Sequence, residues 1–141
     1  MKSSELLIKK IKEFEGCRLS AYTDSVGVPT IGVGHTKGVK IGQKISMEQA
    51  ESFLREDLFS VEKYVNTIPE VNTQGKFDAL VDFVFNLGSG NLASSTLLKL
   101  INNNPDDPAI AKQFKRWVHS GSEVLKGLVI RREKEVELYF S

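Results

Sequence analysis

One short stretch of the chain departs from the helical pattern that dominates the rest. Residues 18–34 hold two apolar runs separated by a turn-forming cluster, Thr23 to Gly27, and the second run is rich in β-branched side chains. This pattern predicts a β-hairpin whose second strand covers residues 28–33. Pro29 has no N–H to donate, so it should lie at a sheet edge or a bulge. One hairpin among helices limits the chain to an α+β fold that is mainly helical.

Apolar residues at helical spacing predict helices on both sides of the hairpin. The first covers residues 4–14 and ends just before Glu15 and Gly16. The second begins at Ser46, which fits a capping box with Gln49, and continues to about residue 65. The third is capped by Thr73 and is apolar almost all round, so it should lie at the centre of a helical lobe.

Shorter helices are predicted in the last third of the chain. Gly88 suits the position that follows the third helix. A helix capped by Ser94 or Ser95 should run through residue 101, and the pair Asp107-Pro108 should open another, with Ile110, Phe114, Trp117 and Val118 as its apolar stripe. A last helix is expected from about 123 to 140, with Arg131 and Glu135 paired at i,i+4.

Length and composition indicate one ordinary globular domain over residues 1–141. Its hydrophobic content is 40% and its charged content is 26%. Within it we expect a β lobe at about 15–45 and a helical lobe at about 66–141 that includes the N-terminal helix. The helix between these ranges should bridge the two lobes.

Charge and composition exclude several classes of function. The net charge is +1 and no long basic stripe occurs, so we expect no nucleic-acid partner. No apolar run reaches the about 18 residues that span a bilayer, which predicts no membrane insertion. Lys9, Lys10 and Lys12 interrupt the N-terminal apolar residues, so no signal peptide is predicted and the chain should be made in the cytoplasm. Two histidines and one cysteine form no metal-ligand pattern, and neither a metal nor a cofactor is expected.

Two carboxylates and a hydroxyl stand within sixteen residues around the predicted hairpin. If residues 23–28 form the turn, Asp24 and Thr30 can approach each other across it, while Glu15 lies at the end of the first helix. Glycoside hydrolysis needs two acids at one bond, one to protonate the leaving oxygen and one to assist water. Gly32 and Gly34 would let a sugar approach the returning strand closely.

The residues around these groups resemble the phage-type lysozymes, the muramidase endolysins of phages and prophages. The matching segments occur in the same order over nearly the whole chain: Glu15-Gly16, Ala21-Tyr22, Asp24, Gly27, Thr30-Ile31-Gly32-Val33-Gly34-His35-Thr36, Phe85-Asn86-Leu87-Gly88, Ser95-Thr96-Leu97-Leu98, Trp117 and Gly127-Leu128-Val129-Ile130-Arg131-Arg132. One departure is that Ser122 follows Gly121 where the family often has a second glycine.

The resemblance implies a lysozyme-like fold and a catalytic set. Glu15 would be the general acid, Asp24 would stay ionised and stabilise the transition state, and Thr30 would orient the attacking water in an inverting reaction. The resemblance also implies that Thr36, Phe85 and Asn86 bind substrate.

Two further residues are implied to support the site. His35 would be a hydrogen-bonded packing residue and not a catalytic base. Arg131 would lie near Glu15, although a neighbouring cation disfavours the protonated form that a general acid needs.

The function implied is a cofactor-free, monomeric muramidase. It would cut the β-1,4 bond between N-acetylmuramic acid and N-acetylglucosamine in peptidoglycan and lyse the bacterial host. Lacking an export signal, it would depend on a holin to reach the cell wall. Two alternatives stay open: a lytic transglycosylase, which would yield anhydro-sugars, and a catalytically silent cell-wall-binding module.

Overall fold

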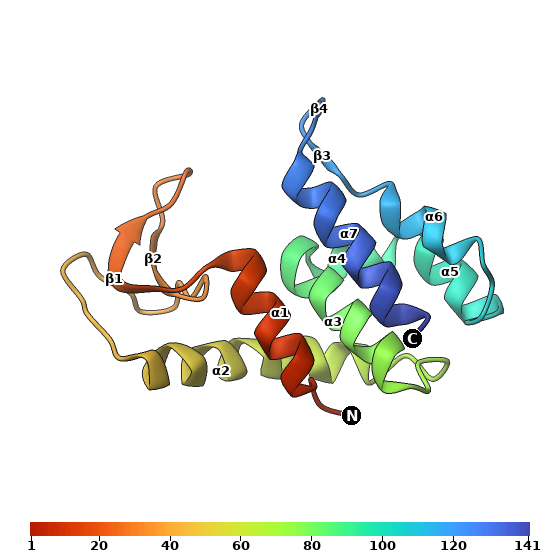
Figure 1. The fold of residues 1–141 in the computed structure, drawn as a ribbon, viewed down its shortest axis with the longest axis horizontal. Helices are drawn as coiled ribbons and strands as arrows, with labels where there is room; N and C mark the ends of the chain where they lie inside the picture. The colour runs from red at the N-terminus through yellow and green to blue at the C-terminus, as the bar shows by residue number, and fades with distance from the viewer. The chain divides into compact units, whose positions relative to one another are not determined.

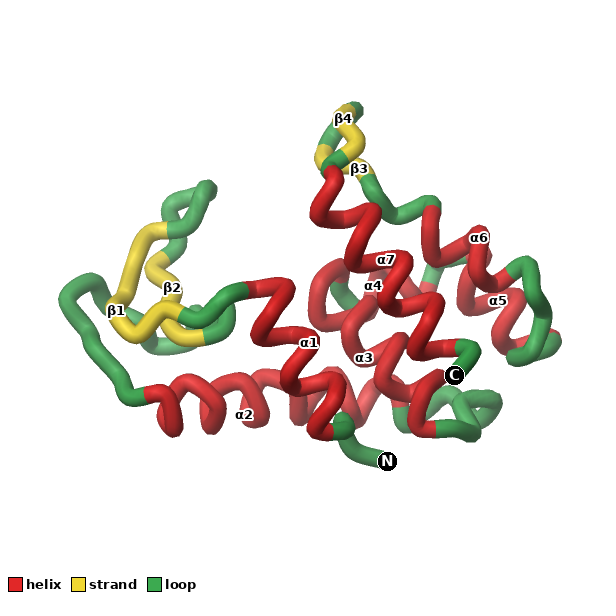
Figure 2. Tube along the Cα trace, in the orientation of Figure 1, coloured by secondary structure: helices red, strands yellow, loops and turns green.

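The computed structural model describes all residues from 1 to 141 and is mainly helical, with two small antiparallel sheets of two strands each (Figures 1 and 2). This confirms the predicted α+β class. In chain order the elements are α1 (Glu5–Glu15), β1 (Arg18–Thr23), β2 (Pro29–Gly32), α2 (Met47–Val65), α3 (Gln74–Leu87), α4 (Ser89–Ala93), α5 (Thr96–Asn103), α6 (Ile110–Lys115), β3 (His119–Ser120), β4 (Glu123–Val124) and α7 (Lys126–Tyr139). No helix is both long and apolar enough to cross a membrane.

The chain divides into two compact units. The hairpin unit consists of residues 8–60, and the helical unit consists of residues 1–7 and 61–141. Helices α1 and α2 each contribute residues to both units. The predicted single domain over 1–141, and the lobe limits of 15–45 and 66–141, stay predictions.

The hairpin unit is built on the predicted β-hairpin. Strands β1 and β2 pair antiparallel, with Tyr22 opposite Thr30 and Thr23 opposite Pro29. Pro29 opens β2 in a sheet that has only edge strands, as its missing N–H predicts. The capping box of α2 is also confirmed: Ser46 Oγ accepts from Gln49 N at 3.1 Å, and Ser46 N donates to Gln49 Oε1 at 2.9 Å.

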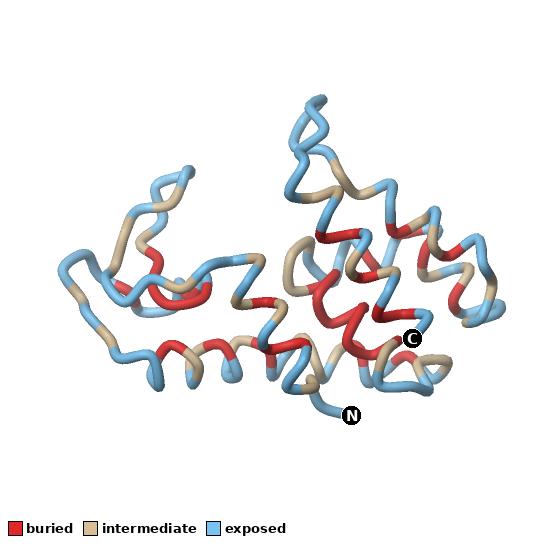
Figure 3. The backbone as a smooth tube through the Cα atoms, in the orientation of Figure 1, coloured by how far each residue is buried: buried red, intermediate tan, exposed pale blue.

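Helix α3 is the buried element of the helical unit, as its apolar pattern predicts. Thr73 caps it by accepting a hydrogen bond from Lys76 N at 3.2 Å, and every residue from Lys76 to Val84 is buried (Figure 3). Helix α7 packs along it. Three charged residues, Lys76, Asp78 and Asp82, are buried on this helix among the apolar ones. Each has a polar partner, since a buried charge is costly unless it is paired.

The position predicted for Gly88 is confirmed: it directly follows α3 with a positive φ of 93°, and its N–H donates to Val84 O. The short helix α4, which begins at the next residue, was not predicted. Helix α5 is capped by Ser95, whose Oγ accepts from Leu98 N at 3.0 Å, and it continues to Asn103, beyond the predicted end at residue 101.

The start predicted for the next helix was also wrong. Asp107 Oδ1 does accept from Ala109 N at 2.9 Å, but residues 108–109 form a turn and α6 begins at Ile110. Helix α6 ends at Lys115, so Trp117 and Val118 lie beyond the helix whose stripe they were expected to complete.

The last helix was predicted to begin three residues too early. Gly121, with φ of +63°, lies in a tight turn that pairs Ser120 with Glu123, so residues 123–124 form strand β4 and α7 begins at Lys126. The predicted pair of Arg131 with Glu135 was wrong as well. Arg131 binds Asp82 of α3, and Glu135 binds Arg132.

Candidate active site

Asp24 holds the turn of the β1–β2 hairpin together. Its Oδ1 accepts hydrogen bonds from Val26 N at 2.9 Å and Val28 N at 2.8 Å, while its own N–H donates to Val28 O at 3.0 Å. The side chain is half-buried, and its Oδ2 accepts no hydrogen bond from the protein. One oxygen therefore orients the carboxylate, and the other is available to a ligand.

Thr30 lies in β2, the strand that returns from the Asp24 turn, and strand alternation favours the Asp24 side of the hairpin for its side chain. Side chains of directly opposed residues share a face, as Tyr22 and Thr30 do, and Asp24 follows Tyr22 by two residues. Thr30 is buried, and its Oγ1 donates to Val28 O at 2.9 Å. Because the hydroxyl proton is used in that bond, Thr30 can offer a ligand only a hydrogen-bond acceptor.

Glu15 is the last residue of α1 and is exposed. Gly16 takes a φ of +73°, and its N–H bonds Lys12 O at 2.9 Å, so the chain leaves the helix directly after Glu15. A Glu15 carboxylate oxygen lies 4.0 Å from the position that a Cβ on Gly34 would occupy. A side chain at position 34 would therefore come into van der Waals contact with this carboxylate.

His35 is buried behind the loop that carries Gly34. Its Nδ1 lies 2.8 Å from Asp57 Oδ2, and its ring stacks on Phe53 with the ring centroids 4.2 Å apart. The Ile31 and His35 backbones also exchange two hydrogen bonds of 2.9 Å each, which close the Gly32–Gly34 loop. These contacts suit a packing residue, the role that the resemblance implies. Thr36, the next residue, is exposed.

Lys12 lies one turn before Glu15 on α1 and forms an ion pair with Glu51 of α2. The hydrogen bond and the charge of Lys12 together lower the pKa of Glu51. The ammonium nearest in sequence to Glu15 is thus engaged with a different carboxylate.

The remaining predicted site residues belong to the helical unit. Phe85 and Asn86 stand half-buried near the end of α3. Arg131 donates two hydrogen bonds to the carboxylate of Asp82, from Nε at 2.9 Å and from Nη2 at 2.8 Å. The predicted proximity of Arg131 to Glu15 stays a prediction.

The helical unit contains a buried charged cluster that the sequence pattern did not predict. Its members are Asp82, Arg131, Arg132 and Glu135. Burial, followed by the hydrogen bond to Asp82, raises the pKa of Glu135 well above its usual range. Burial opposes ionisation of Asp82 too, but hydrogen bonds from Glu135 and Arg131 outweigh it and lower the pKa of Asp82. The pKa values of the two carboxyls are therefore shifted in opposite directions, that of Glu135 upwards and that of Asp82 downwards.

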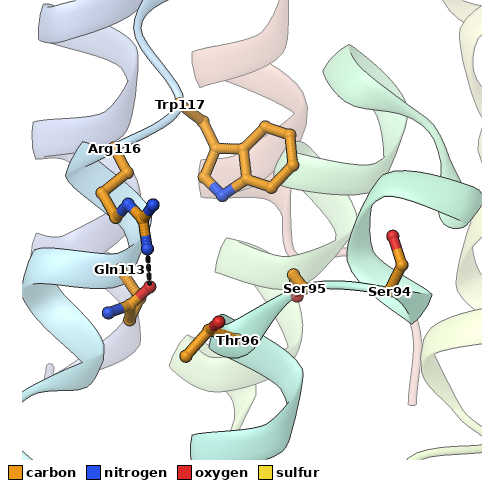
Figure 4. A pocket seen from close by; sticks show the side chains of 6 residues that line it. All are labelled: Ser94, Ser95, Thr96, Gln113, Arg116 and Trp117. Atoms are coloured by element: carbon orange, nitrogen blue, oxygen red, sulfur yellow. Dashed lines mark hydrogen bonds between the residues drawn. The ribbon is translucent and has the colours of Figure 1, made fainter.

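A cavity of about 340 Å³ opens on the helical unit between the start of α5 and the end of α6 (Figure 4). Its lining is polar and contains no carboxylate: Ser94, Ser95, Thr96, Gln113, Arg116 and Trp117. Arg116 donates to Gln113 Oε1 at 3.3 Å, which leaves the amide nitrogen of Gln113 and the indole N–H of Trp117 as donors. The chain holds no group of three or more His, Cys, Asp or Glu side chains arranged to bind a metal.

The chain is similar to known lysozymes over its whole length. Residues 12–135 match the phage lysozyme family. The endolysin of Acyrthosiphon pisum secondary endosymbiont phage 1 is 40% identical over all of this chain and 99% of its own length. Among solved structures, a point mutant of the lysozyme of phage P22 is 38% identical with a TM-score of 0.87, and it aligns over 100% of this chain and 99% of its own.

A third relative is the muramidase domain of SpmX from Asticaccaulis excentricus. It is 32% identical with a TM-score of 0.90, over 99% of this chain and 98% of its own. These likenesses confirm the lysozyme-like fold. The chain therefore belongs to the phage lysozyme family.

Proposed function

We propose that this peptidoglycan-hydrolysing lysozyme cuts the β-1,4 bond between N-acetylmuramic acid and N-acetylglucosamine. The observation that supports the proposal is that Asp24 and Thr30 flank one hairpin turn, each with an oxygen free to accept a hydrogen bond. A water that donates its two protons to these oxygens presents its lone pair to a sugar carbon. Such a water is the nucleophile that glycoside hydrolysis requires.

Glu15 supplies the proton that the leaving group needs. As general acid it donates a proton to the glycosidic oxygen while the water attacks the opposite face of the sugar. The ionised Asp24 stabilises the positive charge that develops on the ring, and it accepts a proton of the water as the bond from water to the sugar carbon forms. Attack from the face opposite the leaving group inverts the anomeric centre.

In its biological setting the chain acts as an endolysin. As a monomer made in the host cytoplasm, it reaches the peptidoglycan once a holin has opened the membrane, and host lysis follows. Thr36, Phe85 and Asn86 bind the glycan, and no metal or cofactor takes part in this scheme.

Products distinguish the two enzymatic candidates. Purified murein is incubated with the wild type and with Glu15→Gln, and the soluble fragments are analysed by mass spectrometry. Hydrolysis gives reducing-end muropeptides with the wild type only, and NMR of freshly cleaved strands then shows the inverted anomer. Anhydro-muropeptides would instead identify a lytic transglycosylase, for which Asp24 and Thr30 have no evident use. Release of nothing by the wild type would favour the wall-binding module.

A further inference from the structure

Lys12 and Glu15 both belong to the last turn of α1. The turn is a regular one, since the N–H of Gly16 donates to Lys12 O at 2.9 Å. Residues three positions apart in a helix are neighbours on its surface, so the ammonium of Lys12 can reach the carboxyl group of Glu15. Such a pair would harm the proposed reaction, because a neighbouring cation favours the ionised carboxylate and a general acid must carry a proton.

Glu51 of α2 holds the Lys12 ammonium in a different ion pair. Both side chains are half-buried, and the hydrogen bond and the charge of Lys12 lower the pKa of Glu51, so Glu51 is ionised at neutral pH. Nη2 of Arg55, one turn further along α2, lies 3.6 Å from the other carboxylate oxygen of Glu51. The carboxylate of Glu51 is therefore held between two cations, one on each helix.

Two further titratable groups of the hairpin unit stand near Glu15, and each is engaged elsewhere. Arg18, three residues after Glu15, lies over the ring of Tyr22 with its guanidinium carbon 4.1 Å from the centroid. His35, next to the glycine beside the Glu15 carboxylate, has its Nδ1 2.8 Å from Asp57 Oδ2. Both contacts are independent of the ion pair between α1 and α2.

One acid and one cation complete the charged groups expected around Glu15. Asp24 accepts two hydrogen bonds from its own turn. Arg131 of the helical unit, which the resemblance brings near Glu15, donates two hydrogen bonds to Asp82. Asp24 and Arg131 are the same in every variant of Lys12 and of its α2 partner, so their influence cancels when those variants are compared.

We propose that Glu51 is a positioning residue: by binding the Lys12 ammonium it keeps this cation from the carboxyl group of Glu15, which then retains the proton that the reaction needs. The inference rests on the proposed function, because it assumes that Glu15 is the general acid. Position 51 must carry a negative charge for this role, since a neutral amide does not compete with Glu15 for an ammonium. Lys12 itself is not required, so its removal should relieve the loss caused by a change at Glu51.

The test is the pH profile of kcat/KM for reducing-end release from murein, measured at low ionic strength so that salt does not screen the charges. The limb on which activity falls with rising pH reports loss of the proton from the general acid. In Glu51→Gln the released ammonium of Lys12 should move this limb to lower pH by about 0.3–0.7 units and reduce the rate there by about two- to fivefold. Glu56→Gln makes the same charge change at an exposed position of α2 and should leave the limb in place.

Two further variants separate this effect from a loss of packing between α1 and α2. Lys12→Met in the Glu51→Gln background leaves no ammonium to pair with Glu15, so the limb should return to its wild-type position. Glu51→Asp keeps the charge and should retain most of the wild-type profile. A merely structural ion pair would instead lower kcat/KM by one factor at every pH, and the double variant would be no better than Glu51→Gln.

The outcomes separate this inference from the proposed function. Suppose that the wild type releases reducing ends, but the Glu51→Gln limb coincides with the wild-type limb or the double variant stays displaced. Either result would overturn the positioning role and leave the muramidase intact. A wild type that releases no reducing ends would overturn the proposed function, and the inference with it.

Discussion

In the hairpin unit Glu15 is exposed and Asp24 is half-buried, whereas in the helical unit Asp82 and Glu135 are completely buried between two arginines. Asp24 uses one carboxylate oxygen to hold its turn and keeps the other free. The oxygens of Asp82 and Glu135 are engaged with Arg131 and Arg132. Catalysis needs carboxylate oxygens that a ligand can reach, whereas carboxyl groups buried against arginines mainly fix positions.

The largest loss of activity is expected at Asp24. Asp24→Asn keeps an amide oxygen to accept from Val26 N and Val28 N, so the hairpin should keep its stability. It loses the negative charge and the base, so murein cleavage should fall by about a hundred- to ten-thousandfold. Asp24→Ala is the matched variant that removes the turn bonds as well. If Asp24→Asn kept near wild-type activity, Asp24 would serve only to hold the turn.

Arg132→Met should show the opposite pattern, a loss of stability. It removes the cation from a buried cluster and leaves the Trp117 carbonyl and Asn86 amide without their donor, so the free energy of unfolding should fall by about 3–5 kcal/mol. Arg116→Met removes the same charge from an exposed position and should cost less than about 0.5 kcal/mol. Urea unfolding of both variants measures the difference. Equal costs would mean that burial of the cluster contributes nothing.

The raised pKa of Glu135 makes the stability of the helical unit dependent on pH. Because burial and Asp82 raise the pKa of Glu135, unfolding above its usual value of 4.5 releases a proton, and this contribution to stability declines as pH rises. Glu135→Gln keeps a neutral donor that does not titrate. The free energy of unfolding of Glu135→Gln, minus that of the wild type, should therefore increase with pH. Urea unfolding between about pH 5 and 7 should show an increase of up to about 1.4 kcal/mol per pH unit. A difference that stays constant with pH would contradict a raised pKa of Glu135 in the folded protein.

The smallest effect on stability is expected at Thr30. Thr30→Val keeps the shape but loses the hydrogen bond to Val28 O, at a cost of about 1 kcal/mol. Its rate on murein should fall by at least about tenfold, since the water loses one of its two acceptors. Thr30→Ser keeps the hydroxyl and should retain most of both. A fully active valine variant would remove Thr30 from the reaction.

The parts of the fold that local chemistry determines could be predicted from the sequence. The hairpin, the capping box at Ser46 and the Thr73 cap depend on residues a few positions apart, and each was confirmed. The short β3–β4 hairpin and the start of α7 were missed, because two-residue strands carry almost no periodic signal and the positive φ at Gly121 ends the helical pattern.

The buried charged cluster depends on contacts between residues far apart in the chain. Asp82 stands among apolar residues of α3, and its partner Arg131 is 49 residues away. The sequence therefore favoured the nearer acid, Glu135, as the partner of Arg131. A charged residue on the buried face of α3 was the one available sign that a partner had to exist. The candidate roles of Glu15, Asp24 and Thr30 came from spacing and resemblance, and they stay predictions.

The most direct test is the initial rate of reducing-end release by Glu15→Gln, expressed per folded molecule and set beside its urea unfolding curve. We expect a rate lower by about a thousandfold or more in a variant that still unfolds cooperatively, because Gln has no proton to give. A folded Glu15→Gln that cleaves murein within about tenfold of the wild-type rate would contradict it.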